Sequence, residues 1–182
     1  MLEDQYGMNF TSSSFFCADR VILPLVNELW NELWNELWND ELMSGAASWT
    51  AFKEAHPSLS RYSQPPGPYA SAEACFDDRH SHRDFWYEVI RDFNRPDATA
   101  LGRAIYAEND VYCGLRSKAE FHALKNAGVF DYAIWVDASD RLPPEDASSC
   151  TVEPWMADFV LDNNGTLEDL KLNLQQLMGS LL

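Results

Sequence analysis

The sequence predicts an α/β domain built on a parallel sheet, and a stretch in the second half of the chain carries this prediction. Two short apolar runs rich in β-branched and aromatic residues, Val111–Leu115 and Tyr132–Val136, have the length and composition of buried strands. Between them, Ser117 and Glu120 have the spacing of a capping box and Gly128 supplies a left-handed stop, which together predict a helix. Strand, helix and strand in this order favour a βαβ unit with parallel strands.

Polar side chains follow both of these predicted strands. Arg116 comes directly after the first strand and Asp137 directly after the second. In parallel α/β sheets, ligands bind outside the carboxyl ends of the strands. We therefore expect the chemistry of this protein to lie near these two residues.

Length and charge exclude several classes of protein. The chain has 182 residues, with 13 Lys and Arg against 29 Asp and Glu, and a formal net charge of −16. This balance argues against general binding to nucleic acid or anionic membranes, which needs a basic surface. No apolar run approaches the roughly 20 residues that span a bilayer. The acidic start of the chain lacks the apolar core of a secretory signal, so we expect a cytoplasmic protein with reduced cysteines.

The first part of the chain predicts the end of a helix, a short strand and a second helix. Met1–Tyr6 resembles the last turn of a helix that begins without a cap, and Met8–Ser12 has strand composition. A helix is expected over Phe15–Val26, where Pro24 should kink or end it. Arg20 lies in this helix and is either a solvated residue or part of a binding site.

A tandem repeat follows, in which NELW occurs three times within Asn27–Leu42. A four-residue repeat drifts slowly around a helix, so Trp30, Trp34 and Trp38 form a winding aromatic stripe. Two interpretations stay open: the stripe is a contact surface for a partner or a second copy, or the repeat is a recent duplication without a role of its own.

The repeat runs into a stretch rich in Ser, Pro and Gly that ends in QPPGPY. Such composition is typical of a loop or an extended linker. We predict that residues 27–69 form a repeat-bearing, proline-rich insertion within a single domain of residues 1–182, and that the core does not need it.

After the insertion, a helix is expected to begin near Ser71. On this helix Arg79 and Arg83 stand four residues apart, so they would share one face and grip a phosphate together. The alternative is that both arginines pair with neighbouring aspartates. His80 and His82 are two residues apart, which is not the spacing of a helical metal pair.

The next predicted helix, Ala98–Glu108, contains a glycine. Gly102 weakens the helix, but its small size suits close packing against another element. The neighbouring residue, Arg103, lies away from the apolar positions Leu101 and Ile105, so it faces either solvent or a ligand.

The order VYCGLR, capped helix, YAIWVDAS, polar connection and ADFVLDNNGTLEDL, with a closing leucine-rich helix, resembles phage-type deoxynucleoside monophosphate kinases and related P-loop kinases. The resemblance covers residues 70–182 well and residues 8–26 loosely. It implies a three-layer α/β sandwich with a parallel sheet, in the host cytoplasm if the protein is phage-encoded. In the complete family form, ATP and Mg²⁺ would serve the transfer of a phosphoryl group to a small-molecule nucleotide.

The resemblance also implies roles for several arginines. Arg116 would contact phosphate from the end of a strand, and Arg141 from the mobile segment after the next strand; these two are the catalytic candidates. The candidates for binding the nucleotide substrate are Arg79, Arg83, Arg103 and Arg20.

The sequence departs from this family in one large respect. GxxxxGK[ST], the loop that holds nucleotide phosphates, occurs nowhere in the chain. We therefore expect a truncated or inactive member of the family, whose reading frame upstream of Met1 encodes the central strand and this loop. The alternative is a non-catalytic α/β module that binds partners through the NELW helix; a DNA mimic rests on net charge alone.

Overall fold

The computed structural model describes residues 2–39, 50, 53–54, 62–63, 65–143 and 150–181, with the backbone alone for residues 33–39. The fold is mixed α/β and mostly helical, with two small sheets. Its contacts divide into two compact units: the first unit is Met1–Phe10 with Gly102–Leu182, and the second unit is Thr11–Leu101. Among the described residues, no helix has the length and apolarity to cross a membrane. The single domain stays a prediction.

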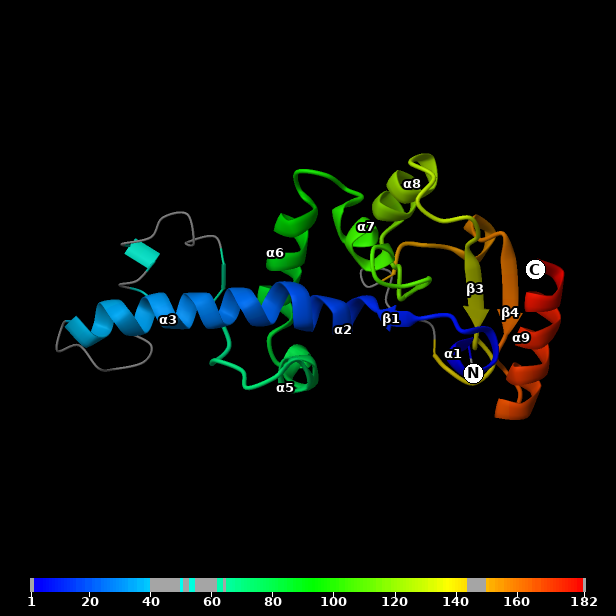
Figure 1. Cartoon of the computed structure of the whole chain (residues 1–182), viewed down its shortest axis with the longest axis horizontal. Helices are drawn as coiled ribbons and strands as arrows, with labels where there is room; N and C mark the ends of the chain where they lie inside the picture. The colour runs from blue at the N-terminus through cyan, green and yellow to red at the C-terminus, as the bar shows by residue number, and fades with distance from the viewer. Residues whose placement is uncertain are drawn as a thin grey trace. The chain divides into compact units, whose positions relative to one another are not determined.

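The second unit begins with a long continuous helix made of α2 (Ser13–Cys17), a π-helical segment (Ala18–Ile22) and α3 (Leu23–Asn39) (Figure 1). Pro24 does not end this helix, which continues to Asn39, and the kink at Pro24 stays a prediction. Proline has no N–H and its ring crowds the carbonyl four residues earlier. Just before it, the Leu23 N–H donates to the Ala18 carbonyl five residues back, and this wider turn lets the helix continue through the proline.

The core of the second unit surrounds the π-helical segment. The helices α5 (Ala72–Asp77) and α6 (Arg83–Asn94) both contact this segment. Apolar side chains from all three helices are removed from solvent: Phe16, Cys17, Ala18, Val21, Ile22, Val26, Cys75, Phe85, Trp86 and Val89. The contact between α2 and α5 includes an aromatic pair. The rings of Phe15 and Phe76 meet edge to face, with their centroids 5.7 Å apart.

Both ends of the predicted insertion contact this core. At its start Leu29 is buried, and the Trp30 indole N–H donates to the Pro66 carbonyl. At its end Tyr62 is buried and its ring lies 5.8 Å from that of Phe85. We therefore revise the prediction that the core does not need residues 27–69. The side chains of the other two repeat tryptophans, Trp34 and Trp38, lie outside the described part of the chain, as does most of 40–61.

Asn27, in the first repeat, links the start of the predicted insertion to its end at Tyr69. The Asn27 side chain donates to the Tyr69 carbonyl at 3.3 Å and accepts the Tyr69 N–H at 3.2 Å. Asn27→Ala should lower the free energy of unfolding by roughly 1–2 kcal/mol, because it leaves two backbone groups without partners. Asn31→Ala is the control, since Asn31 is exposed at the same position of the next repeat. Equal costs in urea denaturation of the two variants would contradict this role of Asn27.

The first unit opens with α1 (Leu2–Tyr6) and the start of β1 (Phe10–Ser12). The strand β1 pairs with β2 (Val111–Cys113) in one sheet, and the Asn9 carbonyl accepts the N–H groups of Asp110 and Val111. The helix α7 (Ala100–Tyr106) precedes β2, and α8 (Lys118–Asn126) follows it. Gly128, which follows α8, has a φ of 62°, so the predicted left-handed stop of this helix is confirmed.

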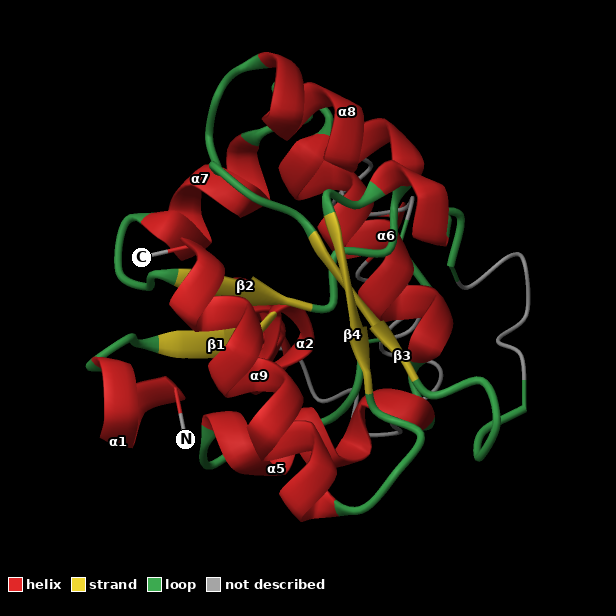
Figure 2. Ribbon diagram, turned by 90° about the vertical axis from the view of Figure 1, so that its right-hand side faces the viewer, coloured by secondary structure: helices red, strands yellow, loops and turns green. Residues whose placement is uncertain are grey.

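The other sheet of the first unit consists of β3 (Ile134–Asp137) and β4 (Phe159–Asp162), which are parallel (Figure 2). The prediction that β2 and β3 are neighbours in a βαβ unit is wrong, because they belong to different sheets. The order of strand, helix and strand was predicted correctly. Order along the chain, however, does not determine which strand lies beside which.

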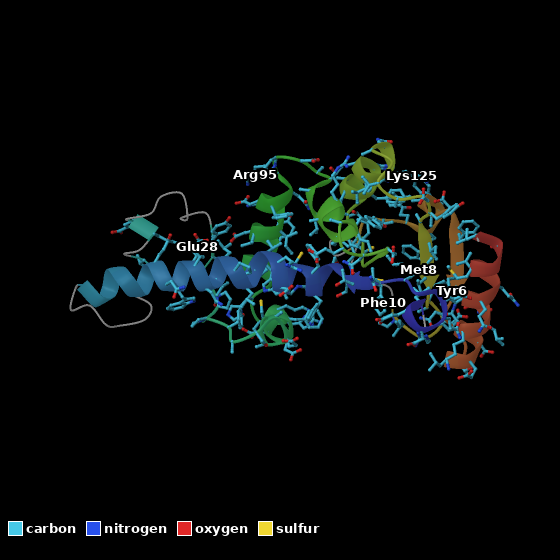
Figure 3. All side chains as sticks on the ribbon, viewed as in Figure 1. Tyr6, Met8, Phe10, Glu28, Arg95 and Lys125 are labelled. Atoms are coloured by element: carbon cyan, nitrogen blue, oxygen red, sulfur yellow. The ribbon has the colours of Figure 1, made fainter. Side chains whose placement is uncertain are left out.

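The helix α9 (Leu167–Leu181) covers β4 and forms the core of the first unit with it. Leu161, Leu174 and Met178 are buried there, and further apolar residues pack against them, Tyr6 and Met8 included (Figure 3). Leu167, predicted on the buried face of this helix, is 63% exposed because it is the first residue of the helix. The prediction that β3 is a buried strand is also wrong: Ile134 is 39% and Val136 52% exposed.

Gly102 packs as closely as its size suggested. A Cβ atom added there would lie 2.4 Å from Cδ2 of Leu124, which is fully buried, so the leucine side chain would have to shift within the core. Gly179, in α9, has nothing within 4 Å of such a Cβ. Both changes to Ala gain the same helix propensity, so Gly102→Ala should be less stable than Gly179→Ala by about 1–3 kcal/mol. Thermal unfolding of the two variants measures this difference, and equal stability would contradict the contact.

Candidate functional site

The parallel pair β3–β4 brings two acidic residues to one edge of the sheet. The strands are in register from Ile134 opposite Phe159 to Asp137 opposite Asp162, so they end together. The Asn163 N–H extends the ladder by donating to the Asp137 carbonyl at 2.7 Å. This is the edge at which ligands bind in parallel α/β sheets.

The loops that leave the two strands are tied to each other. The Asp162 carboxylate accepts the Asn164 backbone N–H at 2.9 Å, and the Asn164 side-chain oxygen accepts the Asp140 N–H at 2.9 Å. The Arg141 Nε–H donates to the Asn163 carbonyl. The predicted catalytic Arg141 is therefore held beside the turn that follows β4. A carboxylate, an amide and a guanidinium group are gathered at one place.

Asp137 is ionised at this edge under neutral conditions. The Ser139 backbone N–H donates to its Oδ1 atom at 3.0 Å, and this hydrogen bond lowers the pKa of the carboxyl group. In the described part of the chain, no group of three or more His, Cys, Asp or Glu side chains is arranged to hold a metal ion. The edge suits hydrogen bonding and charge contacts with an organic ligand, and no metal site is assigned to it.

Arg116 is exposed on the loop between β2 and α8. Its carbonyl accepts the N–H groups of Thr151 and Val152 at 2.9 and 3.2 Å, and the Thr151 hydroxyl accepts the Lys118 N–H at 2.9 Å. These bonds attach the start of α8 to the segment that precedes β4. Arg103, also exposed, lies on α7 in the same unit.

Glu120 does not act as the cap that the sequence predicted. Ser117 caps α8 by accepting the Glu120 N–H, but the Glu120 side chain points inward and accepts the Tyr112 hydroxyl at 3.0 Å. Glu120 is only 9% exposed, and burial raises the pKa of its carboxyl group. The capping-box spacing does not distinguish a capping glutamate from a buried one, because both occur in the first turn of the helix.

The raised pKa of Glu120 has a consequence for stability. The folded state holds this proton more tightly than the unfolded state, so the contribution of Glu120 to stability is greatest below the unfolded pKa and falls as pH rises through the folded pKa. Glu120→Gln keeps an acceptor for Tyr112 and removes the charge. Its free energy of unfolding, measured by urea denaturation, should exceed that of the wild type increasingly as pH rises from about 4. Glu120→Ala should instead lose about 1–3 kcal/mol, because it leaves the Tyr112 hydroxyl without its acceptor.

In the second unit, Arg79 and Arg83 do not share a helix, which corrects the prediction. The helix α5 ends at Asp77, a 3₁₀ turn spans Asp78–His80, and α6 begins at Arg83. Arg79 turns back on its own segment, where its guanidinium lies 3.8 Å from the Phe76 ring and donates to the Phe76 carbonyl at 2.7 Å. Arg20 is exposed and pairs with Asp19 at 3.0 Å.

Arg83 lies at an open groove at the start of α6. The groove is lined by Ser63, His80, Ser81, His82, Arg83, Asp84 and Phe85. Beside it is an arrangement that the sequence did not predict: the Tyr69 hydroxyl donates to Oδ2 of Asp78 at 2.8 Å, and Nδ1 of His82 lies 3.0 Å from the same oxygen. The i,i+4 spacing of Asp78 and His82 was a signal for their contact. Nothing in the sequence indicated Tyr69, which ends the proline-rich stretch.

Charge and burial perturb several groups in this arrangement. The Tyr69 hydrogen bond, with a smaller effect from His82, lowers the pKa of Asp78, so this carboxylate is ionised at neutral pH. Burial and the nearby carboxylate raise the pKa of Tyr69, and the same two causes raise that of Cys75 to about 11. The tyrosine and the cysteine are therefore protonated at neutral pH, and the ionised Asp78 lies 3.0 Å from His82 beside the groove.

Comparison with known proteins finds no match: no family model fits the chain, and neither a curated protein nor a solved structure resembles it significantly.

Proposed function

We propose that this chain is a deoxynucleoside monophosphate kinase-like protein, a relative of enzymes that transfer a phosphoryl group from ATP to a deoxynucleoside monophosphate. One observation carries the proposal: the in-register parallel strands β3 and β4 place Asp137, Arg141 and the turn at Asn163 on the same edge. Ligands of α/β enzymes bind at this edge. The order of strands, capped helix and closing helix supports the same relationship.

We propose further that the two strand pairs, which are separate sheets here, correspond to parts of the single parallel sheet of a three-layer sandwich in the complete family form. In the kinases that the sequence resembles, the strand before the phosphate loop stands at the centre of the sheet. This chain contains no GxxxxGK[ST] loop, and among the described residues the strands pair as β1–β2 and β3–β4 without a strand that joins them. The division into two pairs is the arrangement expected when a central strand is absent.

In this proposal the arginines act by neutralising phosphate charge and positioning the nucleotide. Arg141 lies at the carboxyl end of β3 and β4, whereas Arg116 lies on the loop after β2 and is bonded through its carbonyl to the segment that precedes β4. Arg83 is the favoured substrate contact of the second unit because it lines the groove, whereas the Arg79 guanidinium is occupied by Phe76. The residues present do not fit ATP and Mg²⁺: the chain has no phosphate loop, and its described part has no metal cluster.

Calorimetric titration of each deoxynucleoside monophosphate into the protein tests the proposal. We expect one of them to bind and ATP not to bind, with no ATP-dependent phosphorylation of the nucleotide. Arg141→Ala and Arg116→Ala should each weaken binding of the nucleotide about tenfold or more, which corresponds to the loss of a charge-assisted hydrogen bond to phosphate. Arg95→Ala is the matched control, since this exposed arginine pairs with Asp92 and lines neither site.

Absence of binding by all the deoxynucleoside monophosphates would contradict the proposal. So would a loss of affinity in Arg95→Ala equal to that in Arg141→Ala, because it would show that the response comes from total charge.

A further inference from the structure

The backbone of β3 has one edge that β4 does not use. The Ala133 carbonyl accepts the Phe159 N–H and the Asp137 carbonyl accepts the Asn163 N–H, so residues at these alternate positions face β4. In a parallel strand the N–H and C=O groups of the residues between them face the opposite side. Ile134 and Val136 therefore direct their backbone donors and acceptors away from β4, in a sheet to which the described residues contribute two strands.

The same two residues have exposed apolar side chains, 39% for Ile134 and 52% for Val136. This is unusual, because parallel strands are normally covered on both faces. Edge strands of soluble proteins are usually protected by lysine, proline or a bulge, and the IWVD segment of β3 contains neither lysine nor proline. Hydrogen-bonding groups and apolar side chains thus coincide on one unprotected edge.

The outer edge of β4 differs in this respect. By the same alternation, Val160 and Asp162 face away from β3. The Asp162 carbonyl accepts the Asn173 side-chain N–H at 3.0 Å, and α9 lies along this strand (Figure 1). The last helix of the chain therefore bonds to the outer edge of β4 at Asp162, and among the described residues no second strand lies beside β3.

We propose that the free edge of β3 binds an extended peptide segment of another protein, which adds to the sheet as a third strand. The peptide that fits alternates apolar with small polar residues and carries basic residues at its ends. Its backbone bonds to Ile134 and Val136, and its apolar side chains cover theirs. Its basic ends match exposed acidic residues at the two ends of β3, Asp131 and Asp140.

Charge favours such a peptide over a second copy of the chain. Two copies pairing edge to edge in antiparallel fashion would bring the Asp137 end of one β3 toward the Asp131 end of the other. Each copy also carries a formal net charge of −16. Like charges opposite each other in a sheet are destabilising. A basic strand gains the same backbone bonds without this repulsion. The proposal does not depend on the kinase-like function.

The test uses the full chain and a fluorescently labelled peptide in which valine alternates with threonine between lysine-rich ends. Fluorescence anisotropy should show saturable binding, and hydrogen exchange should slow at the amides of Ile134 and Val136. Val136→Pro removes an edge-facing N–H without breaking a bond to β4 and should weaken binding about tenfold or more. Val160→Pro is the matched control, because it makes the same change on the outer edge of β4 and should leave binding unchanged.

Circular dichroism and thermal unfolding establish that both variants are folded, and the exchange measurement on the wild type stands without any variant. A second peptide with glutamate in place of lysine should bind more weakly. The proposal is overturned if the amides of Ile134 and Val136 are not slowed, if Val160→Pro weakens binding as much as Val136→Pro, or if sedimentation shows that β3 instead pairs two copies of the chain. Failure here leaves nucleotide binding unaffected, since no arginine of that site is altered.

Discussion

The parallel ladder between β3 and β4 is the interaction on which the first unit depends. It is short, and both ends are tied down by polar contacts. At the amino end, the Asp158 carboxylate accepts the Ala133 N–H at 2.9 Å, a bond that lowers the pKa of Asp158, and it also pairs with Lys125. At the carboxyl end, Asp137 and Asn163 continue the ladder. Two isolated strands are marginally stable in water, so Leu174 and Met178, the buried residues of α9, supply the apolar contact that holds this pair.

The candidate site follows from the register of this ladder. Because Asp137 lies opposite Asp162, both strands end at one level and their loops exchange hydrogen bonds. A slip of one residue would exchange the two faces of a strand and separate the two loops. The position of Arg141 is fixed in the same way, through the carbonyl of Asn163. The site therefore depends on backbone geometry more than on any single side chain.

Sequence patterns predicted most of the helices and strands, but they predicted few of the contacts between them. The Ser117 cap, the Gly128 stop and the close contact at Gly102 are confirmed. Local rules were sufficient there because each signal acts within a few residues or through size alone. Pairing of β2 with β1 and the exposure of β3 depend on residues far away in the chain, and periodicity does not contain that information. At Pro24, which is exposed, the local rule was overridden, since the π-helical turn just before the proline lets the helix continue.

The acidity of the chain acquires a physical role when it is set beside the exposed edge of β3. An unprotected apolar edge normally leads to pairing between copies, which proteins prevent by placing charges on or near it. Here the protecting charges flank the strand and extend over the whole chain, with a net charge of −16. Repulsion of this kind acts only against partners of the same sign. In the proposed complex the hydrogen-bonding groups of Ile134 and Val136 bind a basic strand, and the same charge opposes pairing between copies and favours that partner.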